Sequence, residues 1–330
     1  MEMANLSVLL VWAAATALAI AMIAFAVDLA RLSGARVAER DAAREKVTVA
    51  AGGGAPEAEP APGPAAAYGP GNGTAAGGVS RKGAGIGMAL SWLAAAMLLA
   101  AIVLRGLASG RTPWANMYEF VLVGTFVAVA VFVGVCTVRE ARFLGAFVAG
   151  LGATFLVLAQ NVFFVAATGL QPALQNYWLV IHVGVAITAT GIFTVAFVSS
   201  VLQLLRDARD EGTPWLAAWR WLDQTPSPTA LEALSFRLNS VGFVLWTFTL
   251  IGGAIWAEDA WGRYWGWDPK EVWSFVVWVV YAAYLHARTT RGWSGRRAAW
   301  FVVVGYACVL FNFTGVNLVI NGKHSYSGLT

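Results

Sequence analysis

The amino-acid sequence predicts an all-α polytopic membrane protein with about eight transmembrane helices. Hydrophobic residues make up 58% of the 330 residues and charged residues only 12%, a balance that excludes a water-soluble globule. A helix needs roughly 20 apolar residues to cross a bilayer, and apolar runs of about that length recur along the chain. They cover residues 6–30, 85–108, 115–138, 143–165, 177–205, 237–257, 270–288 and 298–319.

The basic residues predict the orientation of these helices. With the N-terminus outside, one set of loops carries only five of the 22 Lys and Arg residues, and the opposite set carries the other seventeen. The five are Arg105, Arg111, Arg263, Lys270 and Lys323. Because positively charged loops resist translocation, the side with seventeen is predicted to be cytoplasmic. Both termini then lie on the extracytoplasmic side of the cell membrane, and the net charge of +4 gives no indication of a nucleic-acid partner.

The chain is predicted to have three parts. Residues 1–32 form a first transmembrane helix, which is expected to be retained because it lacks the basic start of a cleaved signal. Residues 33–84 form a cytoplasmic linker whose Ala, Gly and Pro content predicts disorder. Residues 85–330 form a seven-helix body. Within it, the Trp- and Arg-rich segment 206–236 is predicted to form a short interfacial helix on the cytoplasmic side.

Tryptophan is concentrated in one predicted extracytoplasmic segment. Six of the sixteen tryptophans lie between Trp256 and Trp278, with glycines between them. This pattern predicts a flat aromatic surface, which we call the indole shelf, with polar groups at its edge. Such a shelf suits a large planar ligand with charged corners. The candidate binding residues here are Trp256, Trp261, Arg263, Trp265, Trp267, Asp268 and Trp273.

The residues from Asp268 to Glu271 predict a helix start. Asp268 is a typical N-cap, Pro269 suits the first helical position, and Glu271 completes a capping box. Capping alone would explain Asp268, whatever else it does. It would also fix Trp265 and Trp267 at the outer surface.

Three histidines are the candidate iron ligands. His182 and His324 are both predicted at the extracytoplasmic ends of their helices. Two neutral imidazoles on either side of a porphyrin give a six-coordinate haem iron, and Arg263 or Lys270 could pair with the propionates. His286 follows Asp268 by eighteen residues, roughly 27 Å along the same helix, near the cytoplasmic end. No second histidine lies at that depth, so a two-histidine site there needs another chain. Taken singly, His286 could be an interfacial residue and His324 a solvated tail residue.

These motifs resemble the CcsA/ResC-type cytochrome c biogenesis proteins of system II, some of which are labelled CcsB. The segment Trp256-Ala-Glu-Asp-Ala-Trp-Gly-Arg-Tyr-Trp-Gly-Trp-Asp-Pro-Lys-Glu-Val-Trp273 resembles the WWD signature of that family. The surroundings of His182, His286 and His324 resemble its three histidine motifs. The residues Pro113, Asn116, Tyr118 and Glu119 resemble a further motif of the family.

The resemblance implies a holocytochrome c synthase that acts in a complex with a ResB-type membrane protein. Haem b would bind first at His286, opposite a histidine of the ResB-type partner, and would then pass to His182 and His324. There the two thiols of a Cys-x-x-Cys-His segment of apocytochrome c would add to the haem vinyl groups. The implied catalytic contribution is haem positioning alone, and thiol-reducing proteins are further expected partners.

Two other classes of function remain open on the residues alone. An electron-transfer cytochrome b would carry electrons between haem and quinone, but it usually has paired histidines at both depths of the membrane. A non-redox transporter would use the tryptophans only as an interfacial belt. Neither cysteine, Cys136 or Cys308, lies in a Cys-x-x-Cys pattern, so the chain is not itself a c-type cytochrome or a thiol oxidoreductase.

Overall fold

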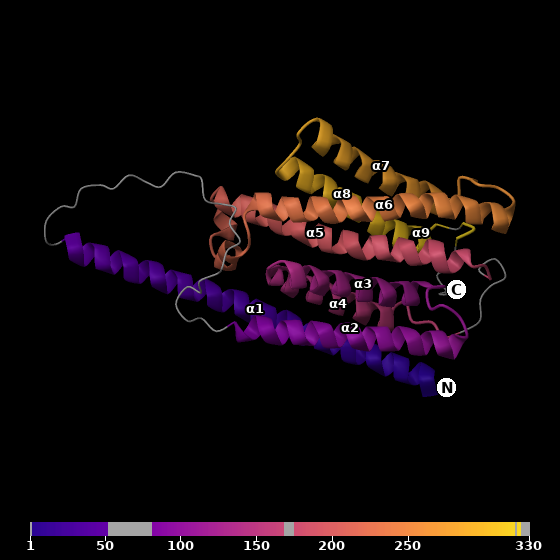
Figure 1. Cartoon of the computed structure of the whole chain (residues 1–330), viewed down its shortest axis with the longest axis horizontal. Coiled ribbons are helices and arrows are strands. Elements are labelled where there is room, and N and C mark those ends of the chain that lie inside the picture. The colour runs from indigo at the N-terminus through magenta and orange to yellow at the C-terminus, as the bar shows by residue number, and fades with distance from the viewer. Residues whose placement is uncertain (1, 52–80, 168–174, 321, 325–330) are drawn as a thin grey trace.

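The computed structural model describes residues 2–51, 81–167, 175–320 and 322–324, and these residues form a bundle of long helices without a strand (Figure 1). The predicted all-α polytopic fold is therefore confirmed. The helices are α1 (Glu2–Ala51), α2 (Lys82–Ser109), α3 (Met117–Val138), α4 (Gly145–Asn161), α5 (Gly184–Asp210), α6 (Pro228–Trp261), α7 (Pro269–Thr290), α8 (Arg296–Phe313) and the short α9 (Gly315–Leu318).

Seven of the helices in the described ranges are long and apolar enough to cross a membrane. The helix α7 is the remaining predicted span. It has 22 residues, but its Trp, Tyr and charged residues make it less apolar than the others. It packs against α8 and α6, and it buries only Val277, Tyr281 and Tyr284. With α7, the bundle matches the eight predicted spans.

The helices are arranged in successive antiparallel layers (Figure 1). The pairs α1 and α2, α3 and α4, α5 and α6, and α7 and α8 follow one another across the bundle. The start of α1, the connection between α6 and α7, and α9 all lie at one end of the bundle, which we call the α9 end. Segments far apart in sequence therefore meet there.

The helix α1 is longer than predicted and is packed into the bundle. It continues beyond residue 32 to Ala51, so the predicted linker 33–84 begins inside a helix, and its residues 52–80 lie outside the described residues. The Phe25 ring on α1 packs closely on two glycines. A Cβ atom added to Gly87 of α2 would lie 2.8 Å from this ring, and one added to Gly145 of α4 would lie 2.6 Å from it. Asp28 accepts a hydrogen bond from the Ala84 amide at 3.1 Å and so caps α2 from the neighbouring helix. These contacts make α1 a structural part of the body.

The segment between α5 and α6 does not form the single interfacial helix predicted for residues 206–236. The helix α5 ends at Asp210, two 3-10 turns follow at Pro214–Leu216 and Arg220–Gln224, and α6 begins at Pro228. Gly212 has a φ of 81°, and Pro214 begins the first turn, so the chain cannot continue as one helix. The predicted anchors are present, because Trp215 is 62% exposed and packs edge-on against Trp219.

We predict opposite effects of two alanine substitutions on α2. Gly87→Ala should destabilise the protein by about 1–3 kcal/mol, because the new methyl group overlaps the Phe25 ring. Gly85→Ala, where nothing lies within 4 Å of the added Cβ, should be neutral or stabilise by up to about 1 kcal/mol through helix propensity. Thermal unfolding of both purified variants tests this. Equal melting temperatures would show that α1 is not packed against α2 in this way.

Candidate functional site

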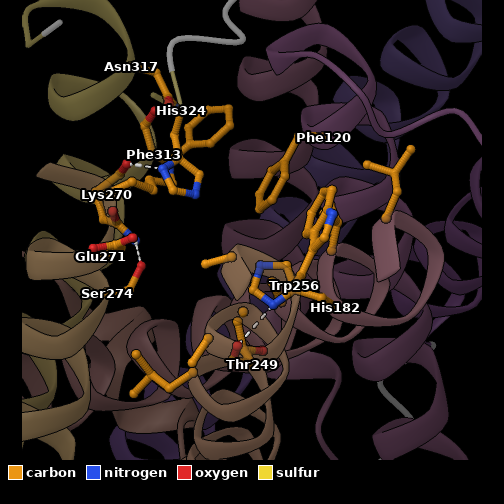
Figure 2. A pocket seen from close by; sticks show the side chains of 18 of the residues that line it. Phe120, His182, Thr249, Trp256, Lys270, Glu271, Ser274, Phe313, Asn317 and His324 are labelled. Atoms are coloured by element: carbon orange, nitrogen blue, oxygen red, sulfur yellow. Dashed lines mark hydrogen bonds between the residues drawn. The ribbon is translucent and has the colours of Figure 1, made fainter. Parts of the chain in front are cut away.

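A large pocket opens at the α9 end of the bundle (Figure 2). Its volume is about 1350 Å³ when the open mouth is included. Its wall comes from the start of α3, from α5 to α8, and from the C-terminal segment. Most of the lining residues are apolar or aromatic, so the pocket favours a large apolar ligand.

His182 enters the pocket wall from the beginning of α5. It lies in a π-helical turn, Leu179–Val183, an irregularity frequent at functional sites. Its Nδ1 atom is 2.9 Å from the Thr249 carbonyl oxygen on α6. Because a carbonyl only accepts hydrogen bonds, Nδ1 carries the proton and Nε2 holds the lone pair. Gly253 makes room for the ring, since a Cβ there would lie 2.7 Å from His182 Cε1.

His324 reaches the same wall from the C-terminal segment. Its Nδ1 atom is 2.8 Å from Asp268 Oδ1, and its ring packs edge-on against Trp261 with the centroids 4.8 Å apart. The Lys323 amide donates a hydrogen bond to Asp268 Oδ2 at 2.6 Å. The carboxylate therefore holds both the backbone and the imidazole of this segment. Again Nδ1 is the donor, so Nε2 holds the lone pair in the neutral ring.

Asp268 is a helix cap with a second role. The predicted capping box is confirmed, with Asp268 accepting from the Lys270 amide and Glu271 accepting from the Asp268 amide. Burial alone would raise the pKa of Asp268. Hydrogen bonds from His324 and from the Lys323 and Lys270 amides outweigh burial and lower this pKa to about 2. Asp268 is thus an anion at neutral pH, and such a partner orients an imidazole and strengthens it as a ligand.

The two histidines face one cavity from different sides (Figure 2). The structure thus brings together His182 and His324, which are 142 residues apart in sequence. Of the predicted aromatic residues, Trp256, Trp261 and Trp265 line the same pocket. Haem ligation by this arrangement remains a prediction.

The six clustered tryptophans do not form one flat shelf, and that prediction is wrong. Trp267 is 76% exposed, and its ring is turned 86° from that of Trp265. Trp273 packs against Phe311, and Trp278 donates a hydrogen bond to Thr247 at 2.9 Å. Trp265 and Trp267 lie in the connection between α6 and α7, while Trp256 and Trp261 are on α6 and Trp273 and Trp278 on α7, where the side chains turn by about 100° per residue. The pocket has indole walls in place of a shelf.

Two predicted residues lie away from this pocket. Arg263 is exposed and is not part of the lining, and its guanidinium group lies against Gly266, which has no side chain. His286 is exposed on α7, near the end of that helix farthest from the α9 end. Lys270, the other predicted propionate partner, does line the pocket.

Several wall residues were missed in the sequence. They are Trp114, Phe120, Trp246, Phe313 and Asn317. Trp114 lies between Pro113 and Asn116 of the further family motif, so proximity to that motif was an available signal. The polar Asn317 within an apolar span was another. Phe120, Phe313 and Trp246 look like ordinary membrane-span residues, and no signal distinguishes them.

A buried ion cluster fixes one wall of the pocket. Glu119 is fully buried and pairs with Arg105 at 2.8 Å and with Arg111 at 2.7 Å. It also accepts a hydrogen bond from the Ala115 amide at 2.9 Å. The loop is thereby held so that Trp114 Nε1 donates to the Leu179 carbonyl at 2.9 Å, next to His182. A carboxylate within a membrane span is costly and usually has a partner, and Glu119 has two.

The wall also contains polar atoms without a partner. Among the described residues, Trp256 Nε1, Glu271 Oε1 and Asn312 Oδ1 are buried and make no hydrogen bond. Buried polar groups are nearly always paired, so unpaired atoms in a pocket wall point to a ligand that carries polar groups. A mainly apolar ligand with polar substituents matches this wall.

The fold and the site together define a multi-pass α-helical membrane protein with two imidazoles in the wall of an aromatic pocket. Residues 114–324 match the family model described as cytochrome C assembly protein. The chain belongs to this family, which confirms the resemblance noted in the sequence. It is a multi-pass membrane protein with a role in cytochrome c biogenesis.

Curated relatives support the same assignment. The cytochrome c biogenesis protein CcsA of Prochlorococcus marinus (strain MIT 9313) is 36% identical over 267 residues, covering 71% of this chain and 81% of that protein. The CcsA protein of Chlamydomonas reinhardtii is 34% identical over 236 residues, covering 70% of this chain and 65% of that protein. This chain thus spans slightly under two thirds of the algal relative.

A solved structure shares the fold. Cytochrome c haem lyase CcmF matches with a TM-score of 0.60 over 99% of this chain and 50% of that one. The two sequences are 17% identical, so this likeness concerns the arrangement of helices alone.

We predict that Glu119→Gln destabilises the protein by about 3–5 kcal/mol, because it leaves two buried arginines without a full counter-charge. Thermal unfolding of the purified variant measures the effect. Glu258→Gln, at an exposed position on α6, is the matched control and should change the melting temperature little. Equal melting temperatures for the two variants would contradict the anchoring role of Glu119.

Proposed function

We propose that this chain is the membrane subunit of a cytochrome c synthetase that binds haem between His182 and His324 for attachment to apocytochrome c. One observation carries the proposal: two imidazoles, each held through Nδ1, lie in the wall of one aromatic pocket. Nε2 of each ring is then the atom that would bind iron. His182 and His324 would supply the two imidazole ligands that haem iron can take.

The chemistry of the wall fits haem b. Its porphyrin is planar and apolar, as are the faces of Trp256, Trp261 and Trp265 that line the pocket. Its propionates are carboxylates, and Trp256 Nε1 and Lys270 provide donors in the same wall. A histidine that binds a metal usually donates a hydrogen bond from its other ring nitrogen. His182 has the Thr249 carbonyl as this acceptor, and His324 has the Asp268 carboxylate.

The residues of this chain would act by holding and orienting their substrate. In the reaction, each cysteine thiol of the Cys-x-x-Cys-His segment adds across one vinyl group of haem. A carbon–sulfur bond forms, the thiol hydrogen moves to the vinyl carbon, and no group leaves. Holding the two reactants in register supplies the acceleration through proximity and orientation. The open mouth of the pocket gives the apocytochrome segment access.

The proposal includes a direction of transport and a partner. The α9 end would be extracytoplasmic, because its loops carry five of the 22 basic residues. Haem would enter near His286, whose exposed ring at the other end of α7 has room for a facing histidine from a ResB-type protein. Apocytochrome c and thiol-reducing proteins would meet the complex at the extracytoplasmic end.

Histidine substitutions with imidazole rescue test the ligation. His182→Ala or His324→Ala should each abolish the six-coordinate low-spin spectrum of haem added to the purified chain. Added imidazole should restore much of that spectrum, because it can occupy the vacated axial position. Trp267→Ala, at an exposed position outside the pocket, is the control and should keep the spectrum. A normal spectrum in both histidine variants would refute ligation by these residues.

Asp268→Asn tests the positioning of His324. Asparagine is an equally good N-cap, so α7 should still begin at Pro269, although its amide nitrogen cannot accept the hydrogen bond that Asp268 Oδ2 takes from the Lys323 amide. Loss of the anionic partner should weaken haem affinity by about 10–100-fold and raise the haem reduction potential. Unchanged affinity and potential would mean that Asp268 acts as a helix cap alone.

A further inference from the structure

Lys270 brings a cation into the pocket wall. Its side chain extends from the first turn of α7, and it is the single Lys or Arg among the described lining residues (Figure 2). Its Nζ atom donates a hydrogen bond to the Asn312 carbonyl at 2.7 Å. An ammonium group has three N–H donors, and no ion pair joins Lys270 to a carboxylate within the described part of the chain. The charge is therefore only partly compensated.

Of the two acidic residues beside Lys270, Asp268 accepts hydrogen bonds at both oxygens, whereas Glu271 accepts at Oε2 and its buried Oε1 has no partner. Glu271 Oε2 accepts hydrogen bonds from the Gly266 amide at 2.8 Å and the Asp268 amide at 3.0 Å. Asp268 is bonded to His324 and to the backbone amides of Lys323 and Lys270. The start of α7 adds the partial positive charge of a helix N-terminus. Neither carboxylate forms an ion pair with Lys270 within the described part of the chain, so its ammonium group can still bind an anion from the pocket.

The other cations at this end are placed differently. Arg105 and Arg111 are paired with the buried Glu119. Lys323 is exposed, with Nζ 5.5 Å from the centre of the Trp261 ring. Arg263 is exposed beside Gly266 and does not line the pocket. From the sequence, Arg263 and Lys270 are equal candidates for binding a propionate. In the structure, Lys270 lines the pocket and Arg263 does not.

We propose that Lys270 binds a propionate of haem and thereby selects and orients the porphyrin that enters the pocket. This inference rests on the proposed function. Haem b carries its two carboxylates on one edge and its two vinyl groups toward the opposite edge. A charge-assisted bond from Lys270 to the carboxylate edge fixes the rotation of the ring about the axis through the two histidines. The vinyl edge then points away from α7, and its position relative to an incoming peptide is set.

A comparison of haem with its iron dimethyl ester tests the proposal. The ester keeps the iron, the ring and the vinyl groups but lacks the two negative charges. The full chain in detergent should bind haem at least about tenfold more tightly than the ester, a difference of about 1.4 kcal/mol. In Lys270→Met this ratio should fall to near one, through weaker haem binding with unchanged ester binding. Lys270→Arg should retain most of the preference.

Controls separate this inference from the proposed function. Arg263→Met should keep the wild-type ratio, and thermal unfolding should show that Lys270→Met is folded. If Lys270→Met binds haem with a normal low-spin spectrum and an unchanged ratio, this inference fails and the proposed function stands. If Arg263→Met abolishes the preference, Arg263 holds the propionate and Lys270 does not. If the wild-type chain shows no low-spin haem spectrum, the proposed function fails first.

Discussion

One buried carboxylate, Asp268, joins three parts of the site. It caps α7, accepts the Lys323 amide of the C-terminal segment, and accepts the Nδ1 proton of His324. This contact ties the His324 ring to the bundle through the start of α7. The same hydrogen bonds keep the carboxylate ionised, with a pKa of about 2, despite its burial. The geometry of one imidazole thus depends on the residue that begins a neighbouring helix.

The opposite imidazole depends on packing between helices. His182 is bound to the Thr249 carbonyl of α6, and Gly253 on the same helix provides the space for its ring. On its other side, the loop anchored by Glu119 places Trp114 against Leu179. A hydrogen bond and a close steric fit fix this ring, whereas a charge holds His324. The positions of the two proposed ligands therefore depend on different changes. A bulkier residue on α6 would displace His182, and loss of the Asp268 charge would affect His324.

Much of the fold was predictable because it depends on local signals. Apolar runs gave the spans, and the Asp268–Glu271 pattern gave the start of α7. The placement of His182 and His324 at one end followed from counting helices across the membrane. The pocket itself depends on contacts between distant segments, such as Asp268 with His324, and sequence spacing does not reveal these. The prediction of an indole shelf was wrong for a different reason: the six tryptophans are spread over α6, the connection after it and α7, and their rings point in different directions. The choice of Lys270 over Arg263 as the propionate partner likewise depends on which side chain lines the folded pocket.

The central claim is that one haem lies between His182 and His324, with Nε2 of each ring on the iron. A cryo-electron microscopy structure of the full chain with added haem tests it most directly. We expect porphyrin density in the pocket at the α9 end, between the two rings, with both Nδ1 contacts retained. Haem density elsewhere, or an iron atom bound by only one of these histidines, would contradict the account.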